Sequence, residues 1–344
     1  MLAELARNVF SLPRPVQTRL AGPPCAADGF ALDPQVQLLL RMGKIVPAPP
    51  SYALPLAEAR RSFDADALLL AGRPRAVGGV TTGVAPGEVP VPLRLYWPPE
   101  APRRGDLPAL LFLHGGGFTV GSLTSHDPVC RRLCADLGCL VVAADYRLAP
   151  EHPYPAALRD SRAAWEWLVG RAKALGVDRR RIAVAGDSAG GNLAIGVARK
   201  AAVPPCALMV LYGGTDSVEV HPSVITFADG FMITRESLEW YVRQYVPPGH
   251  DLSDPCLSPL RADDLHVLPP TYVATAGFDP LRDEARAFAR SAQAQGAEVV
   301  DRCFGSLIHG FLNFTDLKAA CAAFDECTAW LHDQLYPARL SVAR

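Results

Sequence analysis

The feature of the sequence that most constrains its fold is a succession of strand-length segments separated by stretches with helical periodicity. Most of these segments are uninterrupted apolar runs, and they span residues 109–113, 139–144, 182–185, 207–212, 271–276 and 298–303. Apolar runs without polar alternation are typical of strands that are buried on both faces. Regular alternation of strands and helices predicts a parallel sheet that is covered by helices. We therefore predict an α/β fold built on a doubly wound, mostly parallel sheet.

Two parts of the chain depart from this alternation. Upstream, residues 76–84 and 89–96 have the pattern of two antiparallel strands joined by a turn that contains Pro86 and Gly87. Between about 215 and 268 the strand–helix order stops, and the stretch combines helical periodicity with many aromatic residues. We expect this second stretch to be an insertion that lies over the sheet.

The charge balance and the hydropathy exclude several classes of partner. The 34 Lys and Arg residues nearly balance the 35 Asp and Glu residues, giving a net charge of −1, and no block of like charge stands out. This balance argues against nucleic acid as a partner and against an electrostatic membrane contact. No apolar run approaches the ~18 residues of a membrane-spanning helix. We also expect no secretory signal at the N-terminus, where an ordinary surface helix fits the pattern better.

The cysteine pattern gives no indication of a metal site. There are nine cysteines and no C-x-x-C pair. Cys130, Cys134 and Cys139 lie close in sequence, but no further Cys or clustered His completes a set of zinc ligands. We predict that these three are small buried side chains of a helix and the strand after it. An odd number of scattered cysteines favours a reducing compartment, and we expect the cytoplasm.

The sequence Gly186-Asp-Ser-Ala-Gly190 lies directly between a predicted strand and a predicted helix. This context is required by a nucleophile elbow, in which glycines permit a tight reversal and the central serine is held in a strained conformation with its hydroxyl exposed. We predict that Ser188 is the nucleophile. From the residues alone, the alternative is a tight turn in which Ser188 caps the following helix.

A second glycine-rich segment, His114-Gly-Gly-Gly-Phe118, follows a predicted buried strand about 70 residues before Ser188. Acyl transfer requires backbone N–H groups directed at the oxyanion of a tetrahedral intermediate, and glycines let the backbone approach closely. We predict that the amides of Gly115, Gly116 and Ala189 form this oxyanion hole. A phosphate-binding loop is the alternative, but no Gly-Lys-Ser/Thr follows and the spacing differs from a dinucleotide fingerprint.

A serine nucleophile needs a general base. Eight histidines are available, and His309 stands apart because it follows the last predicted strand. The carboxyl ends of parallel strands are where such sheets place their functional sites. We therefore predict that His309 is the base.

The base in turn needs an acid that orients it, expected between nucleophile and base in chain order. Asp279 follows a predicted strand directly, and Pro280 fixes the start of the next helix. We predict Asp279 as this acid. Asp283, about one turn into the helix, is the competing candidate. Asp187 is too close in sequence to the nucleophile for this role, and we expect it to brace the neighbouring loops.

Together these segments resemble the hormone-sensitive-lipase-like carboxylesterases, also called bacterial family IV esterases, of the α/β-hydrolase superfamily. The resemblance covers about residues 30–335 and rests on five motifs in order: His114-Gly-Gly-Gly-Phe118, Asp145-Tyr-Arg-Leu-Ala-Pro-Glu-His-Pro-Tyr-Pro155, Gly186-Asp-Ser-Ala-Gly-Gly-Asn-Leu-Ala194, Asp279-Pro-Leu-Arg-Asp-Glu284 and His309-Gly-Phe311. It implies an α/β-hydrolase fold with a mostly parallel eight-stranded sheet flanked by helices. It also implies that residues 145–155 brace the oxyanion side.

The resemblance further implies a helical cap and so a division of the chain. The cap is expected to comprise an N-terminal segment, 1–60, and an insertion, 215–268, while 61–214 and 269–344 form the catalytic domain. The first 25 or so residues have no evident family counterpart, and Gly213-Gly-Thr215 replaces a Tyr-Pro type ending. Both departures concern the cap and therefore substrate fit.

These observations predict a serine carboxylic-ester hydrolase that uses an acyl-enzyme intermediate and needs no cofactor or metal. The expected partner is a small uncharged ester with a short to medium acyl chain. An amidase or deacetylase with the same triad is the nearest alternative. A small-molecule receptor on this fold is another, although that class typically lacks the base. The sequence leaves the oligomeric state open, a homodimer included.

Overall fold

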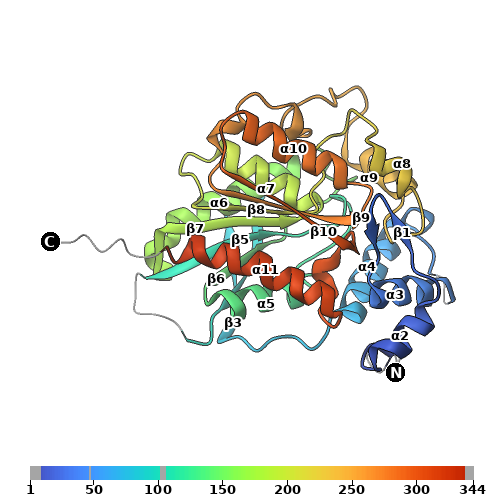
Figure 1. Ribbon diagram of the computed structural model, residues 1–344. Helices are drawn as coiled ribbons and strands as arrows, with labels where there is room; N and C mark the ends of the chain where they lie inside the picture. The colour runs from blue at the N-terminus through green and yellow to red at the C-terminus, as the bar shows by residue number, and fades with distance from the viewer. Residues whose placement is uncertain (1–8, 46–47, 101–105, 338–344) are drawn as a thin grey trace.

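The centre of the structure is an eight-stranded sheet with the strand order β10-β9-β8-β7-β5-β6-β4-β3 (Figure 1). This computed structural model describes residues 9–45, 48–100 and 106–337. The strands are β3 (Gly79–Ala85), β4 (Val91–Trp97), β5 (Leu107–Leu113), β6 (Leu140–Ala144), β7 (Val177–Asp187), β8 (Leu208–Leu211), β9 (Thr271–Phe278) and β10 (Val299–Ile308). Only β4 runs antiparallel to its neighbours, β3 and β6. The prediction of a mostly parallel eight-stranded sheet is confirmed.

The apolar runs that predicted the central strands are indeed buried. Every residue of β5, β6, β8 and β9 is buried. Each aliphatic or aromatic side chain fully removed from water in this way stabilises the fold by about 1.5–3 kcal/mol. β3, at the edge of the sheet, is mostly exposed instead.

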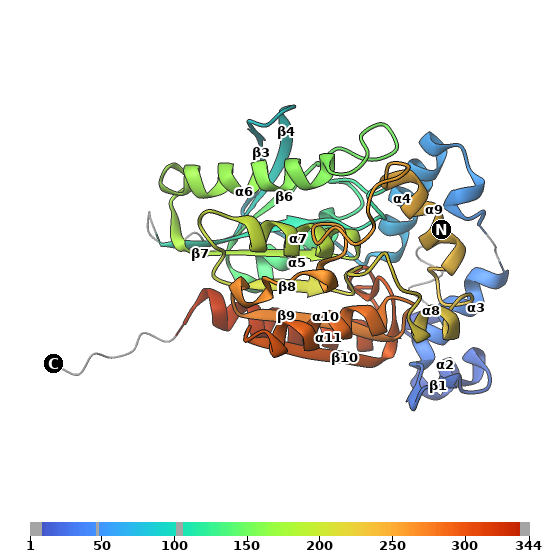
Figure 2. The same ribbon diagram turned by 90° about the horizontal axis from the view of Figure 1, so that it is seen from above.

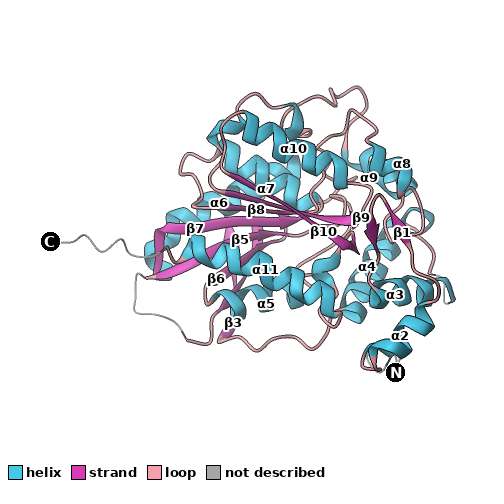
Figure 3. Ribbon diagram, in the orientation of Figure 1, coloured by secondary structure: helices cyan, strands magenta, loops and turns pink. Residues whose placement is uncertain are grey.

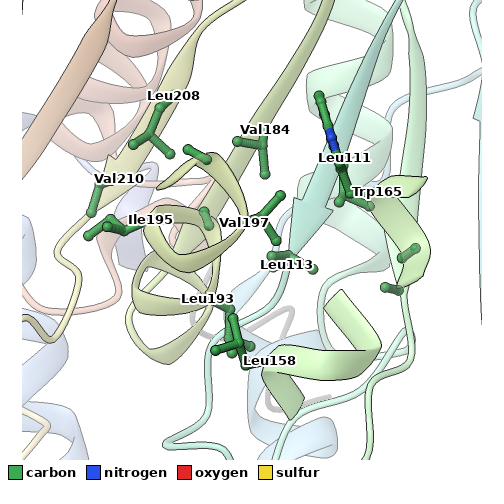
Figure 4. Close-up of a cluster of buried hydrophobic side chains, with 14 of the residues drawn as sticks. Leu111, Leu113, Leu158, Trp165, Val184, Leu193, Ile195, Val197, Leu208 and Val210 are labelled. Atoms are coloured by element: carbon green, nitrogen blue, oxygen red, sulfur yellow. The ribbon is translucent and has the colours of Figure 1, made fainter. Parts of the chain in front are cut away.

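Helices cover the sheet on both faces (Figure 3). The helices α5 (Asp127–Leu137) and α11 (Lys318–Leu335) contribute to one apolar core, which also contains Cys130, Cys134 and Cys139 as predicted. The helices α6 (Ala156–Leu175), α7 (Ala189–Lys200) and α10 (Arg282–Ala294) contribute to the core on the other face. In that core, Ile195 of α7 lies beside Val210 of β8, and Leu193 of α7 lies beside Leu158 of α6 (Figure 4).

Most of the remaining elements gather at one end of the sheet, near the carboxyl ends of β9 and β10 (Figure 2). From the N-terminal segment come α2 (Arg14–Ala21), β1 (Ala26–Ala27), β2 (Phe30–Ala31), α3 (Pro34–Ile45), the 3-10 turn η1 (Ser51–Ala53) and α4 (Leu56–Leu70). The insertion after β8 supplies α8 (Pro222–Thr226), α9 (Arg235–Tyr245) and the 3-10 turns η2 (Pro259–Arg261) and η3 (Leu265–Val267). One further turn, η4 (Phe311–Asn313), precedes α11.

Three of the differences from the sequence-based expectation concern strands β7 and β10 and the boundary at residue 60. Strand β7 begins at Val177 rather than at residue 182, because its first half carries polar, partly exposed side chains that leave no apolar run. Strand β10 continues to Ile308. The predicted boundary at residue 60 falls inside α4, since Leu56–Leu70 contains neither proline nor glycine to end the helix.

The prediction of a surface helix at the very N-terminus concerns residues 1–8, which lie outside the described residues. Across the ranges given above, no helix is both long and apolar enough to cross a membrane.

Candidate active site

Ser188 occupies the sharp turn between β7 and α7. Its backbone has φ 52° and ψ −121°, a conformation that a residue with a side chain adopts only under strain. The turn requires glycine at position 190, because a Cβ there would collide with the Leu113 carbonyl oxygen. The Ser188 side chain makes no helix-capping hydrogen bond, so the alternative of a capping serine does not hold.

The Ser188 hydroxyl instead faces His309, which directly follows β10. His309 Nε2 lies 3.0 Å from Ser188 Oγ, and His309 Nδ1 lies 2.9 Å from Asp279 Oδ2. The imidazole is also packed against the Tyr212 ring, with centroids 4.8 Å apart. Because the carboxylate accepts a hydrogen bond, the proton resides on Nδ1 and leaves Nε2 free to accept from the serine.

Asp279 is held rigidly at the carboxyl end of β9. Its side chain is fully buried, and Oδ1 accepts a hydrogen bond from the Leu281 amide at 2.8 Å. The competing candidate Asp283 points elsewhere: it pairs with Arg282 at 2.8 Å and accepts the Ser223 amide at 2.9 Å. The structure therefore brings Asp279, and not Asp283, to the histidine.

The glycine-rich segment after β5 departs from the prediction at one position. The Gly115 amide donates to Asp187 Oδ1 at 2.8 Å, so its single N–H is already engaged. Among the described residues, the amides of Gly116, Gly117 and Ala189 meet no acceptor. The Gly115 amide, predicted as an oxyanion donor, is therefore not free to act as one, whereas the amide of Gly117, which the prediction left out, is free. Gly115 and Gly117 lie in one run of three glycines. The sequence shows that run, but it does not show which of the three amides remains free.

The backbone of this loop is shaped to leave those amides free. The Gly116 carbonyl accepts from Thr119 and Val120 at 3.0 and 2.9 Å, closing a tight turn. Gly116 and Gly117 have φ angles of 118° and 56°, which only glycine adopts easily.

Residues 145–155 contact this loop, as the family resemblance implied. The Tyr146 hydroxyl donates to the His114 carbonyl at 2.7 Å, and the Ala149 amide donates to the Phe118 carbonyl at 2.8 Å. Burial lowers the pKa of His114 to about 3, so this histidine is neutral and takes no part as an acid or base near pH 7.

One cluster offers the residue types of a metal site. The ligand atoms of Asp216, Glu219 and His221 lie within 4.8 Å of one another. Arg261, however, pairs with Asp216 at 2.6 Å and with Glu219 at 3.1 Å. The Arg261 guanidinium therefore already pairs with both carboxylates that a cation would need, and the cluster is an ion-pair network of the insertion.

Comparison with known proteins agrees with this fold. The sequence profile of the alpha/beta hydrolase fold family matches residues 110–313. The chain is 39% identical over 326 residues to the carboxylic ester hydrolase LipN of Mycobacterium tuberculosis, a match that covers 91% of this chain and 85% of LipN. It is 38% identical over 279 residues to ethyl acetate hydrolase of Pseudomonas putida, with 78% and 86% covered. The solved structure of a hyperthermophilic esterase from the archaeon Pyrobaculum calidifontis superposes with a TM-score of 0.82 at 34% identity, covering 88% and 98%.

The fold is therefore that of an α/β-hydrolase, and the enzyme is a carboxylic ester hydrolase. Within that superfamily, the chain belongs to the hormone-sensitive-lipase-like carboxylesterases, the bacterial family IV esterases.

Proposed function

We propose that this ester hydrolase acts on short- to medium-chain acyl esters through Ser188, His309 and Asp279. The observation that carries the proposal is the hydrogen-bonded row from Asp279 through His309 to the Ser188 hydroxyl, with distances of 2.9 and 3.0 Å. A nucleophile, a base and an orienting acid in this order are what two-step acyl transfer requires.

In the first step, Ser188 Oγ attacks the ester carbonyl carbon while His309 Nε2 takes the hydroxyl proton. Asp279 stabilises the imidazolium that forms. As the tetrahedral intermediate collapses, His309 returns the proton to the leaving alcohol, and the acyl group remains on Ser188. Water then repeats the sequence and releases the acid.

The oxyanion of each tetrahedral intermediate needs N–H donors. We propose the amides of Gly116, Gly117 and Ala189, because these three are free of other acceptors among the described residues. Ala189 is also the first residue of α7, where the helix dipole favours negative charge. Each well-placed donor contributes about 3–4 kcal/mol to stabilising the transition state.

We further propose that 1–60 and 215–268 form a cap over a catalytic domain made of 61–214 and 269–344. The gathering of α2, α3, α8 and α9 at one end of the sheet supports this division (Figure 2). Aromatic side chains of the insertion approach the glycine loop: the rings of Tyr245 and Phe118 are stacked 3.8 Å apart. An apolar cap of this kind suits an uncharged ester of limited length. The similarity to a relative named ethyl acetate hydrolase also supports a short ester as substrate.

The test is a series of p-nitrophenyl esters of increasing acyl length, assayed beside matching p-nitroanilides with the wild type, Ser188→Ala and Ser291→Ala. We expect efficient turnover of short and medium esters and much slower turnover of anilides. Ser188→Ala should lose roughly 10⁶-fold in kcat. Ser291, on α10, is the matched control and should keep wild-type rates.

Two outcomes would contradict the proposal. Near-full activity of Ser188→Ala would remove the assigned nucleophile. A preference for anilides over esters would instead favour an amidase with the same triad.

A further inference from the structure

Strands β9 and β10, which carry the proposed acid and base at their carboxyl ends, do not pair regularly there. The pairing register shifts between Phe304 and Ile308, so that three residues of β10 lie opposite Gly277 of β9 alone. A bulge of this kind bends a strand and redirects the side chains that follow it. Because this bulge lies just before both Asp279 and His309, its shape determines how the two side chains meet.

The N-terminal hairpin formed by β1 and β2 packs against the β10 side of this bulge (Figure 1). Phe30 of β2 lies directly on Gly305, where a Cβ would collide with the phenyl ring. Just after the hairpin, the Asp33 amide donates to the Ser306 carbonyl at 3.0 Å. In the described sheet β10 is an edge strand, so the N-terminal segment supports the bulge from outside the sheet.

Arg282, the first residue of α10, connects the same hairpin to the β9 side of the bulge. Its side chain is 8% exposed. Nη1 donates to the Gly277 carbonyl at 2.9 Å, and Nη2 pairs with Asp28, in the turn of the hairpin, at 2.8 Å. The third bond, from Nε to Asp283 at 2.8 Å, stays within α10. One guanidinium therefore joins the hairpin to the strand that carries Asp279.

Two aromatic rings flank this guanidinium. Its central carbon lies 5.2 Å from the ring centroid of Phe227, in the insertion, and 6.0 Å from that of Phe30. Such rings attract the cation and shield its ion pair from water. Arginine suits this place because its planar fork directs donors to several acceptors at once, whereas the single ammonium of lysine does not.

We propose that Arg282 is a positioning residue for the reaction: by tying the N-terminal hairpin to Gly277, it fixes the bulge that aligns Asp279 with His309. The hairpin then contributes to the rate of the chemical step as well as to the shape of the substrate site. The effect on the rate rests on the proposed function, whereas the effect on the hydrogen bond between Asp279 and His309 does not.

The first experiment observes that hydrogen bond directly. A proton shared between an imidazole nitrogen and a carboxylate gives a far-downfield proton NMR resonance, and His309→Gln assigns it to His309 Nδ1. In Arg282→Lys and in Asp28→Asn we expect this resonance to move upfield and to exchange faster with water. An unchanged position and exchange rate in both variants would overturn the proposal, whatever the enzyme hydrolyses.

The second experiment measures steady-state kinetics with p-nitrophenyl butyrate. Arg282→Lys should lower kcat about 10- to 100-fold with little change in KM, because misaligned groups slow the chemistry without weakening substrate binding. Asp28→Asn should lower kcat about 3- to 10-fold by the same route. Asparagine tolerates the positive φ of 50° at position 28 as aspartate does, so the turn is kept. A raised KM with unchanged kcat would limit Arg282 to shaping the substrate site and overturn the proposal.

Two matched controls alter the same residue types elsewhere. Arg286, one turn further along α10, pairs with Asp301 of β10 at 3.2 Å, and Arg286→Lys controls for a change on this helix. Asp263→Asn removes the charge of an exposed aspartate. Both controls should keep the wild-type kcat and the wild-type resonance.

The double variant Asp28→Asn/Arg282→Lys tests whether the two residues act through one bridge. We expect it to be no slower than Arg282→Lys, whereas losses that multiply would overturn the proposal. If Arg282→Lys does not fold, Asp28→Asn compared with Asp263→Asn decides through both readouts. All these variants retain Ser188, so a wild-type kcat in Arg282→Lys and Asp28→Asn would overturn the role of Arg282 and leave the proposed function standing.

Discussion

The ring of Tyr241 lies directly over Gly117, so closely that a Cβ at position 117 would collide with it. Tyr241 belongs to α9 in the insertion, and α9 contacts η1 of the N-terminal segment. Two segments far apart in the chain therefore meet above an amide that we assign to the oxyanion hole. A substrate whose carbonyl oxygen reaches this amide must fit beneath the Tyr241 ring.

This contact predicts the acyl-length limit. Tyr241→Ala should raise kcat/KM for p-nitrophenyl decanoate relative to p-nitrophenyl butyrate by about tenfold, because longer chains gain room to bury further methylenes. Val242→Ala, an exposed position on the same helix, is the control and should leave the ratio unchanged. A chain-length profile of Tyr241→Ala identical to that of the wild type would contradict this prediction.

The two candidate acids are separated by a pair of isosteric variants. Asp279→Asn should lower kcat roughly 10⁴-fold, since an amide NH₂ facing His309 Nδ1 favours the wrong tautomer. Asp283→Asn should retain most of the activity, because Asp283 pairs with Arg282 rather than with His309. Steady-state kinetics with p-nitrophenyl butyrate measure both effects. The reverse order of severity would show that Asp283 is the acid.

Local signals in the sequence were sufficient to predict Ser188, Asp279 and His309 as neighbours in one candidate site. Ser188 and Asp279 follow strands with readable apolar runs, His309 follows the last predicted strand, and parallel strands bring their carboxyl ends to one edge. The three side chains accordingly lie in one hydrogen-bonded row. Residues at the carboxyl ends of strands can thus be predicted from the hydropathy pattern of the sequence.

The free amides of the glycine loop could not be predicted from the sequence. Which amides of a three-glycine run remain free depends on the bond between Gly115 and Asp187, which are 72 residues apart in the chain. No periodicity or spacing encodes that pairing. The same holds for the contact of Tyr241 with Gly117, which exists only once the insertion has folded back over the sheet.

Helix α4 holds the glycine loop through Arg60. Its guanidinium donates to the Thr119 and Ala149 carbonyls, both at 2.9 Å, and pairs with Glu151 at 2.7 Å. Arg60→Ala leaves these partly buried carbonyls without a charged donor, and we expect the free energy of unfolding to fall by about 1–3 kcal/mol. Urea denaturation measures this loss.

The adjacent Arg61 is exposed, so Arg61→Ala is the matched control and should stay within about 0.5 kcal/mol of the wild type. Arg60→Ala should also lower kcat severalfold, because the loop that carries Gly116 and Gly117 loses a support. Equal stability and equal kcat for the two variants would show that the Arg60 contacts contribute nothing.

The last prediction concerns a buried acid on α10. Glu284 Oε1 accepts the amides of Thr215 and Asp216 at 2.6 and 3.3 Å, and burial raises the pKa of this carboxyl to about 8 despite those two bonds. Its folded pKa thus lies above its unfolded value, and between the two the folded state binds more protons. By linkage, the contribution of Glu284 to stability is fully present below about pH 4 and is lost as the pH rises towards 8.

Glu284→Gln keeps an amide oxygen for the two backbone donors and removes the titration. In urea denaturation between pH 5 and pH 8.5, we expect the free energy of unfolding of the variant to exceed that of the wild type at pH 8. The difference should shrink as the pH falls towards 5. Glu298→Gln, at an exposed position, controls for the loss of one surface charge and should show no such trend. A wild type that gains stability over Glu284→Gln as the pH rises would mean that the folded carboxyl titrates below its ordinary pKa.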